Sequence, residues 1–417
     1  MTDHAKPRAV RVEDLSVFAG DTRLLGPVSF DIEAGGTLVI MGETGAGKSL
    51  IAQAILGALP NGLHMEGQIA IDGNRVESLT PERRAALWGK DIATLPQEPW
   101  RALDPLMRAS PQVNEAHRFV AGYDSSEARR QTAADFETLG LVGSERRLPG
   151  TLSGGMAQRV AFAAATAGRA DILLADEPTK GLDATRHDRI VRLLKRVPEE
   201  GGTLLAITHE AAVARALGGM LVILKDGSVV EEGPAADVLA APQHPYSQEL
   251  LAADPASWPR ANLPAIGDAI LTAENLAVAR GTNVLVDGFG LTVHASERIA
   301  VTGSSGVGKS SLLDVLAGLL KPARGSLHRS KRLHPTSVQK LYQDPPAAFP
   351  PYIPLGRTLQ DVARLHRVDW STMMDYLQRL SLHPSLLERK PNEVSGGELQ
   401  RISIARALAV RPEVILA

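Results

Sequence analysis

The chain has 417 residues, a formal net charge of -2 and no cysteine. This length exceeds one compact core, so we expect two or three domains. The near balance of 45 basic and 47 acidic residues leaves no positive field for a nucleic-acid backbone, and the lack of cysteine excludes disulfides, thiolate metal sites and cysteine nucleophiles. Because no long apolar run occurs and the first residues are charged, we expect no signal peptide and a soluble, intracellular protein.

The first predicted elements are strands followed by a helix. Alternating apolar residues in "VSFDI" (28–32) predict a half-buried strand, and "TLVIMG" (37–42) predicts a short buried one. The segment "KSLIAQAILGAL" (48–59) predicts a helix. Strand, glycine-rich loop and helix therefore follow one another, as in an α/β nucleotide-binding fold.

The loop between this strand and helix is the first chemical motif. "GETGAGKS" (42–49) fits the phosphate-loop pattern G-x-x-x-x-G-K-[ST]. In such a loop backbone N–H groups and the positive helix end bind phosphate, Lys48 reaches the β and γ oxygens, and Ser49 is a ligand of Mg²⁺. A plain glycine turn before a helix is the alternative. The expected nucleotide-binding residues are Gly42, Thr44, Gly45, Ala46, Gly47, Lys48 and Ser49.

A second anion-binding pattern follows a helical stretch at about 98–150. "LSGGMAQR" (152–159) places a hydroxyl and exposed N–H groups at a helix start, an arrangement suited to phosphate. An ordinary N-cap is the alternative. The expected binding residues are Ser153, Gly154 and Gly155.

Acidic residues come next, at the end of a predicted buried strand, "DILLAD" (171–176). Asp176 lies at its carboxyl end, where α/β folds place ligand chemistry, and an acid there can hold Mg²⁺. Glu177 follows directly. Because "DEPT" enters a turn, a helix cap is the alternative for these acids. Another buried strand, "GTLLAIT" (202–208), leads to His209.

The first half closes with a hairpin and a Pro-containing segment. "MLVILKDGSVVEEG" (220–233) predicts two strands that turn at Asp226-Gly227. A Pro/Ala-rich stretch without periodicity then predicts a linker. We expect a first domain over 1–252, a linker over 253–268 and a second domain over 269–417.

The second half repeats the first. Residues 15–42 match 276–303 without a gap. "RIAVTG" (298–303) predicts the strand before a second phosphate loop, "GSSGVGKS", and "VSGGELQR" (394–401) repeats the serine-glycine pattern. The expected binding residues are Gly303, Ser305, Gly306, Val307, Gly308, Lys309, Ser310, Ser311, Ser395, Gly396 and Gly397.

The two phosphate loops, the two "SGG" signatures and "LLADEPTKGLD" resemble a tandem pair of ATP-binding-cassette (ABC) ATPase domains. The resemblance implies the fold class α/β, with two phosphate-loop (RecA-like) domains, each carrying an antiparallel β subdomain and a helical subdomain. It implies ATP and Mg²⁺ as ligands. In that family the phosphate loop of one cassette and the signature of another hold each ATP, so we expect cassettes to pair within the chain or with another cassette.

The resemblance also assigns roles to single residues. Glu177 is similar to the general base and His209 to the switch histidine that contacts the γ-phosphate. Asp183 is similar to the D-loop residue, and Phe18 to the ring that stacks on adenine. Gln97 and Gln343 are similar to the Q-loop glutamines that sense Mg²⁺ and water. The expected catalytic residues are thus Glu177, His209 and Gln97, and the expected metal ligands Ser49, Gln97, Asp176, Ser310 and Gln343.

The second half departs from the pattern at two points. Ala279 lies opposite Phe18, so we expect weaker nucleotide binding there. The spacing between Ser153 and Asp176, applied from Ser395, reaches position 418, whereas the sequence ends at Ala417. We therefore expect a second domain truncated just before its acids, in a fragment, a truncated gene or a product of a misplaced stop. Only the first site would then hydrolyse ATP, and the second would at most bind it.

Three segments resemble fused ATPase subunits of oligopeptide, dipeptide and nickel importers: "QEPWRALDPLM" (97–107), "QDPPAAFPPYIPLGRTLQDV" (343–362) and "QHPYSQELLAA" (243–253). An ordinary Pro turn with a short helix is the alternative for the last. The resemblance implies two integral-membrane permease subunits and an extracytoplasmic solute-binding protein as partners. It implies a cytoplasmic location, peripheral on the inner face of a bacterial membrane.

Two other functions remain open. A soluble tandem ATPase of the ribosome-associated type also has two cassettes, although its linker is generally long, charged and helical. An ATPase accessory of a carbon-phosphorus lyase complex is the other alternative. We expect no nucleic-acid partner, and the solute is not encoded in this chain.

Overall fold

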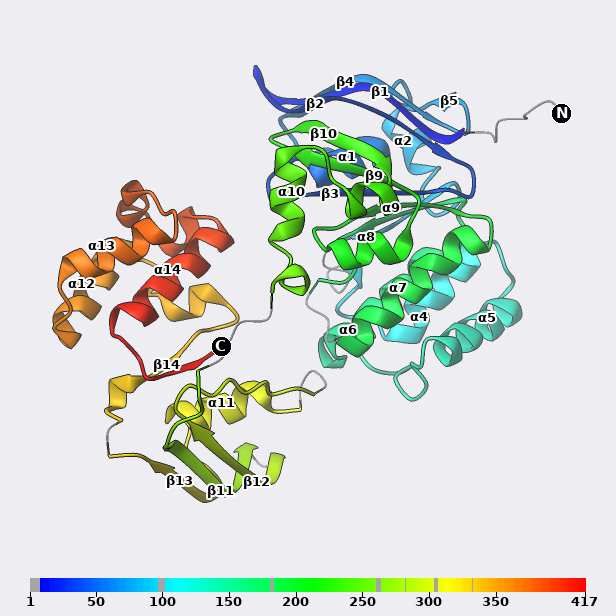
Figure 1. Cartoon of the computed structure of the whole chain (residues 1–417). Coiled ribbons are helices and arrows are strands. Elements are labelled where there is room, and N and C mark those ends of the chain that lie inside the picture. Colours follow the sequence, from blue (N-terminus) through cyan, green and yellow to red (C-terminus); the bar gives the residue numbers. More distant parts are fainter. Residues whose placement is uncertain are drawn as a thin grey trace. The chain divides into compact units, whose positions relative to one another are not determined.

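The computed structural model describes residues 8–96, 102–180, 184–259, 264–281, 283–303, 307–331 and 333–417. Contacts between residues divide the chain into two compact units, 1–260 and 261–417 (Figure 1). In the first unit an antiparallel sheet lies at one edge, and the helices α4, α5 and α6 lie at the opposite end (Figure 1).

The antiparallel sheet of the first unit has the strand order β2-β1-β4-β5. The strands are β1 (Arg8–Ala19), β2 (Thr22–Glu33), β4 (Leu63–Ile71) and β5 (Asn74–Arg75). In β2 the side chains of Val28, Phe30 and Ile32 are buried, whereas the residues between them are exposed. This alternation confirms the half-buried strand predicted from "VSFDI".

The central sheet of the first unit has the order β10-β9-β3-β8-β7-β6. The strands are β3 (Thr37–Gly42), β6 (Ile92–Leu95), β7 (Ile172–Asp176), β8 (Thr203–Ile207), β9 (Met220–Lys225) and β10 (Ser228–Pro234). All neighbours pair in parallel except the hairpin β9-β10. Both faces of β3 are covered: Leu38 and Ile40 belong to one core, and Val39 and Met41 to the other. Burial on both faces explains why these strands are continuously apolar.

Helices cover both faces of this sheet. The helix α1 packs with the antiparallel sheet in one core, and α4 to α9 contribute to the other. The helix α1 ends where Gly57 adopts a left-handed conformation, φ 70°. The helices are α1 (Lys48–Leu56), α2 (Pro81–Ala85), α4 (Ala109–Glu115), a π-helical turn (Ala116–Val120), α5 (Ser125–Thr138), α6 (Gly154–Thr166), α7 (Ala184–Glu199), α8 (Ala211–Leu217), α9 (Ala235–Ala240) and α10 (Pro245–Ala252).

The second unit repeats part of this arrangement. Its antiparallel sheet has the order β12-β11-β13, and β14 pairs in parallel with β15. The strands are β11 (Ala269–Arg280), β12 (Asn283–His294), β13 (Arg324–Arg329), β14 (Val338–Lys340) and β15 (Val414–Leu416). The helices are α11 (Lys309–Ala317), α12 (Leu355–His366), α13 (Trp370–Arg379) and α14 (Gly396–Ala409). One core joins α12, α13 and α14, and another joins the antiparallel sheet to α11.

One predicted element of the second unit is wrong: residues 298–303, "RIAVTG", form no strand in the described structure. The corresponding strand of the first unit, β3, is hydrogen-bonded on its two sides to β8 and β9. Both of those strands follow Asp176, and the described part of residues 264–417 contains no counterpart of them. Without neighbours, 298–303 have no ladder in which to pair their backbone groups.

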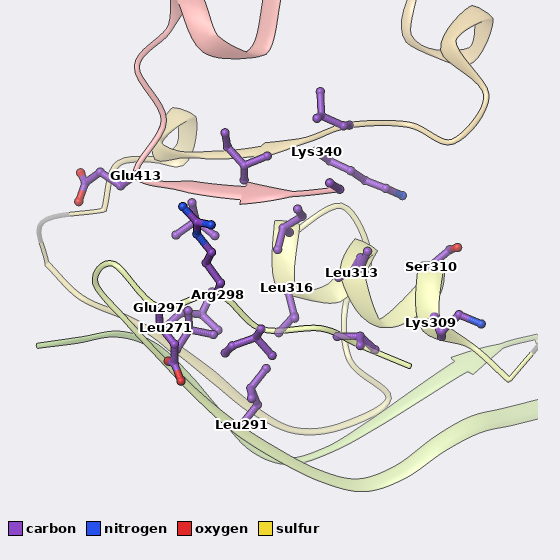
Figure 2. A pocket seen from close by; sticks show the side chains of 18 of the residues that line it. Leu271, Leu291, Glu297, Arg298, Lys309, Ser310, Leu313, Leu316, Lys340 and Glu413 are labelled. Carbon is purple, nitrogen blue, oxygen red and sulfur yellow. The ribbon is translucent and has the colours of Figure 1, made fainter. Parts of the chain in front are cut away.

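A cavity of about 880 Å³ lies beside this segment. Figure 2 shows the apolar side chains of Leu313 and Leu316 on α11 and of Leu291 beside the antiparallel strands, with Lys309 and Ser310 at one edge. The cavity is lined by residues of the unpaired segment, Arg298, Ile299 and Val301, and also by Lys309 and Ser310 of the second phosphate loop.

Candidate nucleotide site

The first phosphate loop connects β3 to α1 and is shaped around the Lys48 side chain. The Lys48 ammonium donates hydrogen bonds to the carbonyl oxygens of Gly42 and Glu43, each at 2.8 Å, and the residue is only 7% exposed. Burial lowers the pKa of Lys48, while the nearby carboxylates of Glu177 and Asp176 act in the opposite direction. The ammonium group thus lies inside the loop, close to both acids.

Glycine is required at two positions of this loop. A Cβ atom at Gly42 would lie 2.3 Å from the carbonyl oxygen of Leu224 on β9. Gly47 has φ 94°, and a Cβ atom there would lie 2.9 Å from Leu25 Cδ1. The loop therefore packs its backbone directly against neighbouring strands, which leaves its exposed residues Glu43, Thr44 and Gly45 at the surface.

The second phosphate loop forms the same lysine contact. Lys309 donates to the carbonyl oxygen of Gly303 at 2.7 Å, and Gly308 has φ 105° before α11. Val307 and Ser310 are exposed, and Ser311 is half-buried. The predicted residues Ser305 and Gly306 lie outside the described residues.

Asp176 lies at the carboxyl end of β7, next to the first phosphate loop. Burial raises the pKa of its carboxyl group, and a hydrogen bond with the Ser49 side chain acts in the opposite direction. Its Oδ1 atom is buried and has no hydrogen-bond partner. An unpaired buried carboxylate oxygen beside a hydroxyl fits Mg²⁺, which prefers oxygen ligands and usually keeps further sites for water and phosphate.

Glu177 and His209 form a pair beside the acid of β7. His209 Nδ1 lies 2.5 Å from Glu177 Oε2, and Glu177 is 8% exposed. The hydrogen bond with Glu177 raises the pKa of His209. Glu177 adopts φ 48°, a left-handed conformation uncommon outside glycine, and its N–H donates to the Ile207 carbonyl at 2.9 Å. The left-handed backbone at Glu177 thus occurs at the residue whose carboxylate contacts the histidine.

Glu210 was missed by sequence reasoning. Its carboxylate accepts a hydrogen bond from the Thr179 hydroxyl at 2.6 Å and lies 3.0 Å from His187 Nε2. Thr179 and His187 flank residues 181–183, which include the predicted D-loop residue Asp183 and lie outside the described residues. One carboxylate next to His209 thus ties together both flanks of that segment. In the sequence Glu210 is simply the acidic residue after His209, and no motif indicates its contacts with Thr179 and His187.

The first signature begins the helix α6. The Ser153 hydroxyl accepts from Met156 N at 3.4 Å, and Gly154 is exposed while Gly155 is buried. The Gln158 amide of the same helix donates to the carbonyl oxygen of Pro178, the residue after Glu177. The signature helix is therefore coupled to the loop that carries the predicted base.

The second signature begins α14 with its own cap. Ser395 accepts from Glu398 N at 3.3 Å, and Glu398 accepts in return from the backbone and hydroxyl of Ser395, each at 2.8 Å. These reciprocal bonds form a capping box. Gly396 and Gly397 are exposed.

The predicted adenine-stacking residue Phe18 lies on β1 and is half-buried. Its ring stacks with His64 of β4, with ring centroids 5.3 Å apart. Phe18 and His64 are register partners in the antiparallel pair, so the stack is a cross-strand contact. In the second unit Arg280 follows Ala279 and binds Asp314 at 2.6 Å. The two units thus differ in the surface that they offer to a base.

The two predicted Q-loop glutamines have different outcomes. Gln97 lies outside the described residues. Gln343 lines the cavity of the second unit, which also contains Lys309 and Ser310 at its edge. Of the other predicted residues, the structure brings five together in the first unit: Lys48, Ser49, Asp176, Glu177 and His209.

If the Phe18 ring stacks on adenine, as the resemblance implies, its removal should weaken ATP binding without changing turnover at saturation. Base stacking on an aromatic ring contributes about 1–3 kcal/mol, so Phe18→Ala should raise the KM for ATP by about tenfold, with kcat within about twofold. Phe18→Tyr keeps the ring and should restore the KM. An unchanged KM in Phe18→Ala, measured by steady-state ATPase kinetics, would exclude this ring from the base site.

The site combines a phosphate loop, an acid at the end of a neighbouring strand and a carboxylate-histidine pair, all on a parallel sheet. This combination defines a nucleotide-hydrolysing protein of the phosphate-loop class. The family profile described as "ABC transporter" matches residues 25–180 and 286–417. The chain belongs to this family and is an ATPase that binds ATP. The predicted α/β fold class and the resemblance to tandem ABC ATPases are confirmed.

Relatives match over nearly the whole chain. The peptidoglycan transport ATP-binding protein YejF of Agrobacterium fabrum is 32% identical, over 97% of this chain and 81% of its own length. The glutathione import ATP-binding protein GsiA of Pectobacterium atrosepticum is 29% identical, over 98% of this chain and 77% of its own length. Both are ATP-binding proteins of transport systems by name.

Among solved structures, cbiO1 of Clostridium perfringens, part of the ABC transporter complex cbiONQ, matches with a TM-score of 0.50 and 24% identity. The match covers 56% of this chain and 92% of that protein. At this identity the likeness shows the fold alone.

In the described part of the present chain, no helix has the length and apolar character needed to cross a lipid bilayer.

Proposed function

We propose that this protein is the ATP-hydrolysing subunit of a bacterial importer for a peptide, a nickel chelate or a similar small solute. The observation that carries the hydrolytic part is the Glu177–His209 pair next to a phosphate loop already shaped around Lys48. The import part is supported by relatives named for peptidoglycan transport and glutathione import.

The proposed chemistry uses one residue for each task. Lys48 leaves its two carbonyl partners and binds the β and γ oxygens, together with the N–H groups at the start of α1. Ser49 and Asp176 would hold Mg²⁺, which when bound neutralises charge on the phosphate oxygens. Glu177 accepts a proton from the attacking water. His209 keeps the Glu177 carboxylate in place and donates to the γ-phosphate.

The remaining predicted residues have supporting roles in this proposal. Phe18 stacks on adenine, and Gln97 and Asp183 complete the first site. The signatures Ser153–Gly155 and Ser395–Gly397 bind the γ-phosphate of a nucleotide held by a different cassette. Lys309, Ser310 and Gln343 bind nucleotide and Mg²⁺ more weakly, because Ala279 offers no ring to the base. The first domain over 1–252, the linker over 253–268 and the second domain over 269–417 are part of the proposal.

The proposed partners are two permease subunits in the membrane and an extracytoplasmic solute-binding protein, with this chain on the inner face. Uptake of labelled glutathione, tripeptides and nickel by cells that lack the gene tests this proposal. We expect uptake of one of these solutes to fall, and to be restored by the wild-type gene but not by Glu177→Gln. Normal uptake with a defect in phosphonate growth or in translation would instead favour a carbon-phosphorus lyase accessory or a ribosome-associated ATPase.

A further inference from the structure

The hydrolytic site leaves one sequence motif without a role, the segment "QHPYSQELLAA" at 243–253. Its tyrosine, Tyr246, lies on α10 and is only 3% exposed. The Tyr246 hydroxyl accepts a hydrogen bond from the backbone N–H of Glu43 at 3.1 Å, across 203 residues of sequence. Glu43 is the second residue of the first phosphate loop.

Each part of the motif helps to hold this tyrosine. The Glu231 carboxylate of β10 accepts from the N–H groups of Gln243 and His244, at 2.8 and 3.1 Å, and so fixes the start of α10. The His244 ring accepts from Tyr246 N at 3.2 Å and caps the helix, which Pro245 begins. The ammonium group of Lys225 lies over the Tyr246 ring, 4.7 Å from its centroid. The hydroxyl group is therefore held rigidly against the loop.

The backbone of Glu43 is held from both sides. Its N–H binds Tyr246, and its carbonyl oxygen accepts from Lys48 at 2.8 Å. If Lys48 moves to the phosphates of a nucleotide, its hydrogen bond to this carbonyl oxygen is lost, and the backbone hydrogen bond from Ala46 N at 3.2 Å remains there. Tyr246 then supplies a side-chain hydrogen bond to this backbone unit that does not depend on Lys48.

We infer that Tyr246 is a positioning residue that keeps the phosphate loop in its binding shape while Lys48 changes partners. The role of the motif is then to connect α10 to the nucleotide loop. This inference rests on the proposed nucleotide site. A loop already held in shape loses less conformational entropy on binding, so the effect should appear in ATP affinity.

Tyr246→Phe tests the inference because it removes only the hydroxyl group and keeps the ring, its burial and the contact with Lys225. We expect the Kd for ATP, measured with a fluorescent analogue, to rise about fivefold, with kcat at saturating ATP within about twofold. Hydrogen exchange of a peptide spanning residues 42–47 should be faster in the nucleotide-free variant. Tyr352→Phe, at a residue that is 84% exposed in the second unit, is the matched control and should change neither quantity.

Unchanged ATP affinity and unchanged exchange would overturn the inference. A lower Tm with wild-type affinity would overturn it too, because the contact would then be purely structural. If the wild-type protein itself failed to bind ATP, the proposed nucleotide site would be wrong. In that case faster exchange at residues 42–47 in Tyr246→Phe would still support the positioning contact.

Discussion

Replacing Glu177 with glutamine should abolish most ATP turnover and leave ATP binding intact. The amide keeps the size of the side chain and can still face His209, but it cannot accept the proton of the attacking water. Loss of a general base lowers a rate by about 10²- to 10⁴-fold, so we expect kcat to fall within this range. Steady-state phosphate release measures this change, and a nucleotide-binding assay should give a Kd within about twofold of wild type.

The position of Glu177 makes this a sharp test. The carboxylate is nearly buried and lies 2.5 Å from His209 Nδ1. Glu200→Gln is a matched control in the same unit, since the Glu200 side chain is exposed and forms an ion pair with Arg196 at 2.8 Å. Glu200→Gln should keep wild-type turnover. A Glu177→Gln protein that retained a third or more of wild-type turnover would show that another group accepts the proton.

Replacing Lys48 with methionine should remove most ATP binding. Methionine keeps the buried aliphatic stem and loses the ammonium group, so the main change is the loss of charge-assisted hydrogen bonds to phosphate. Such bonds contribute about 1.5–3 kcal/mol each, and we expect ATP affinity to fall on the order of 100-fold. Titration with ATP measures the affinity, and a Tm close to wild type would show that the fold is retained.

The matched variant is Lys309→Met, because Lys309 forms the same contact with its own loop, to the Gly303 carbonyl at 2.7 Å. We expect this change to lower turnover by no more than about threefold, since only the first unit combines a phosphate loop with the Glu177–His209 pair among the described residues. A loss of turnover equal to that of Glu177→Gln would refute hydrolysis at the first site alone.

The parts of the site that sequence reasoning predicted are those whose chemistry is local. A phosphate loop needs glycines, a lysine and a serine within eight consecutive positions, and the loop at 42–49 has the predicted strand before it and helix after it. The acids fall at the end of β7 as predicted, because a run of apolar residues fixes where a buried strand ends. The repeat predicted the same loop twice, and in both loops the lysine donates to the carbonyl oxygen of the first glycine.

The strand predicted at 298–303 failed for a physical reason that no local pattern contains. A parallel strand requires neighbours, and those of β3 come from residues 203–207 and 220–225, far along the chain. The apolar residues of 298–303 predict a buried strand. They do not indicate whether neighbouring strands are present to pair with it. In the described structure a cavity lies beside this segment.

By itself, then, the sequence determined the two phosphate loops, the two signatures, the α/β class and the family, because each depends on residue types at fixed short spacings. Only the tertiary structure decided which distant groups meet. It brought the Tyr246 hydroxyl to the Glu43 N–H, the Glu210 carboxylate to Thr179 and His187, and His64 to Phe18. Hydrogen bonds and ring contacts act over a few ångströms in space, whereas a sequence pattern records separation along the chain, so packing of the sheet and its helices had to be known first.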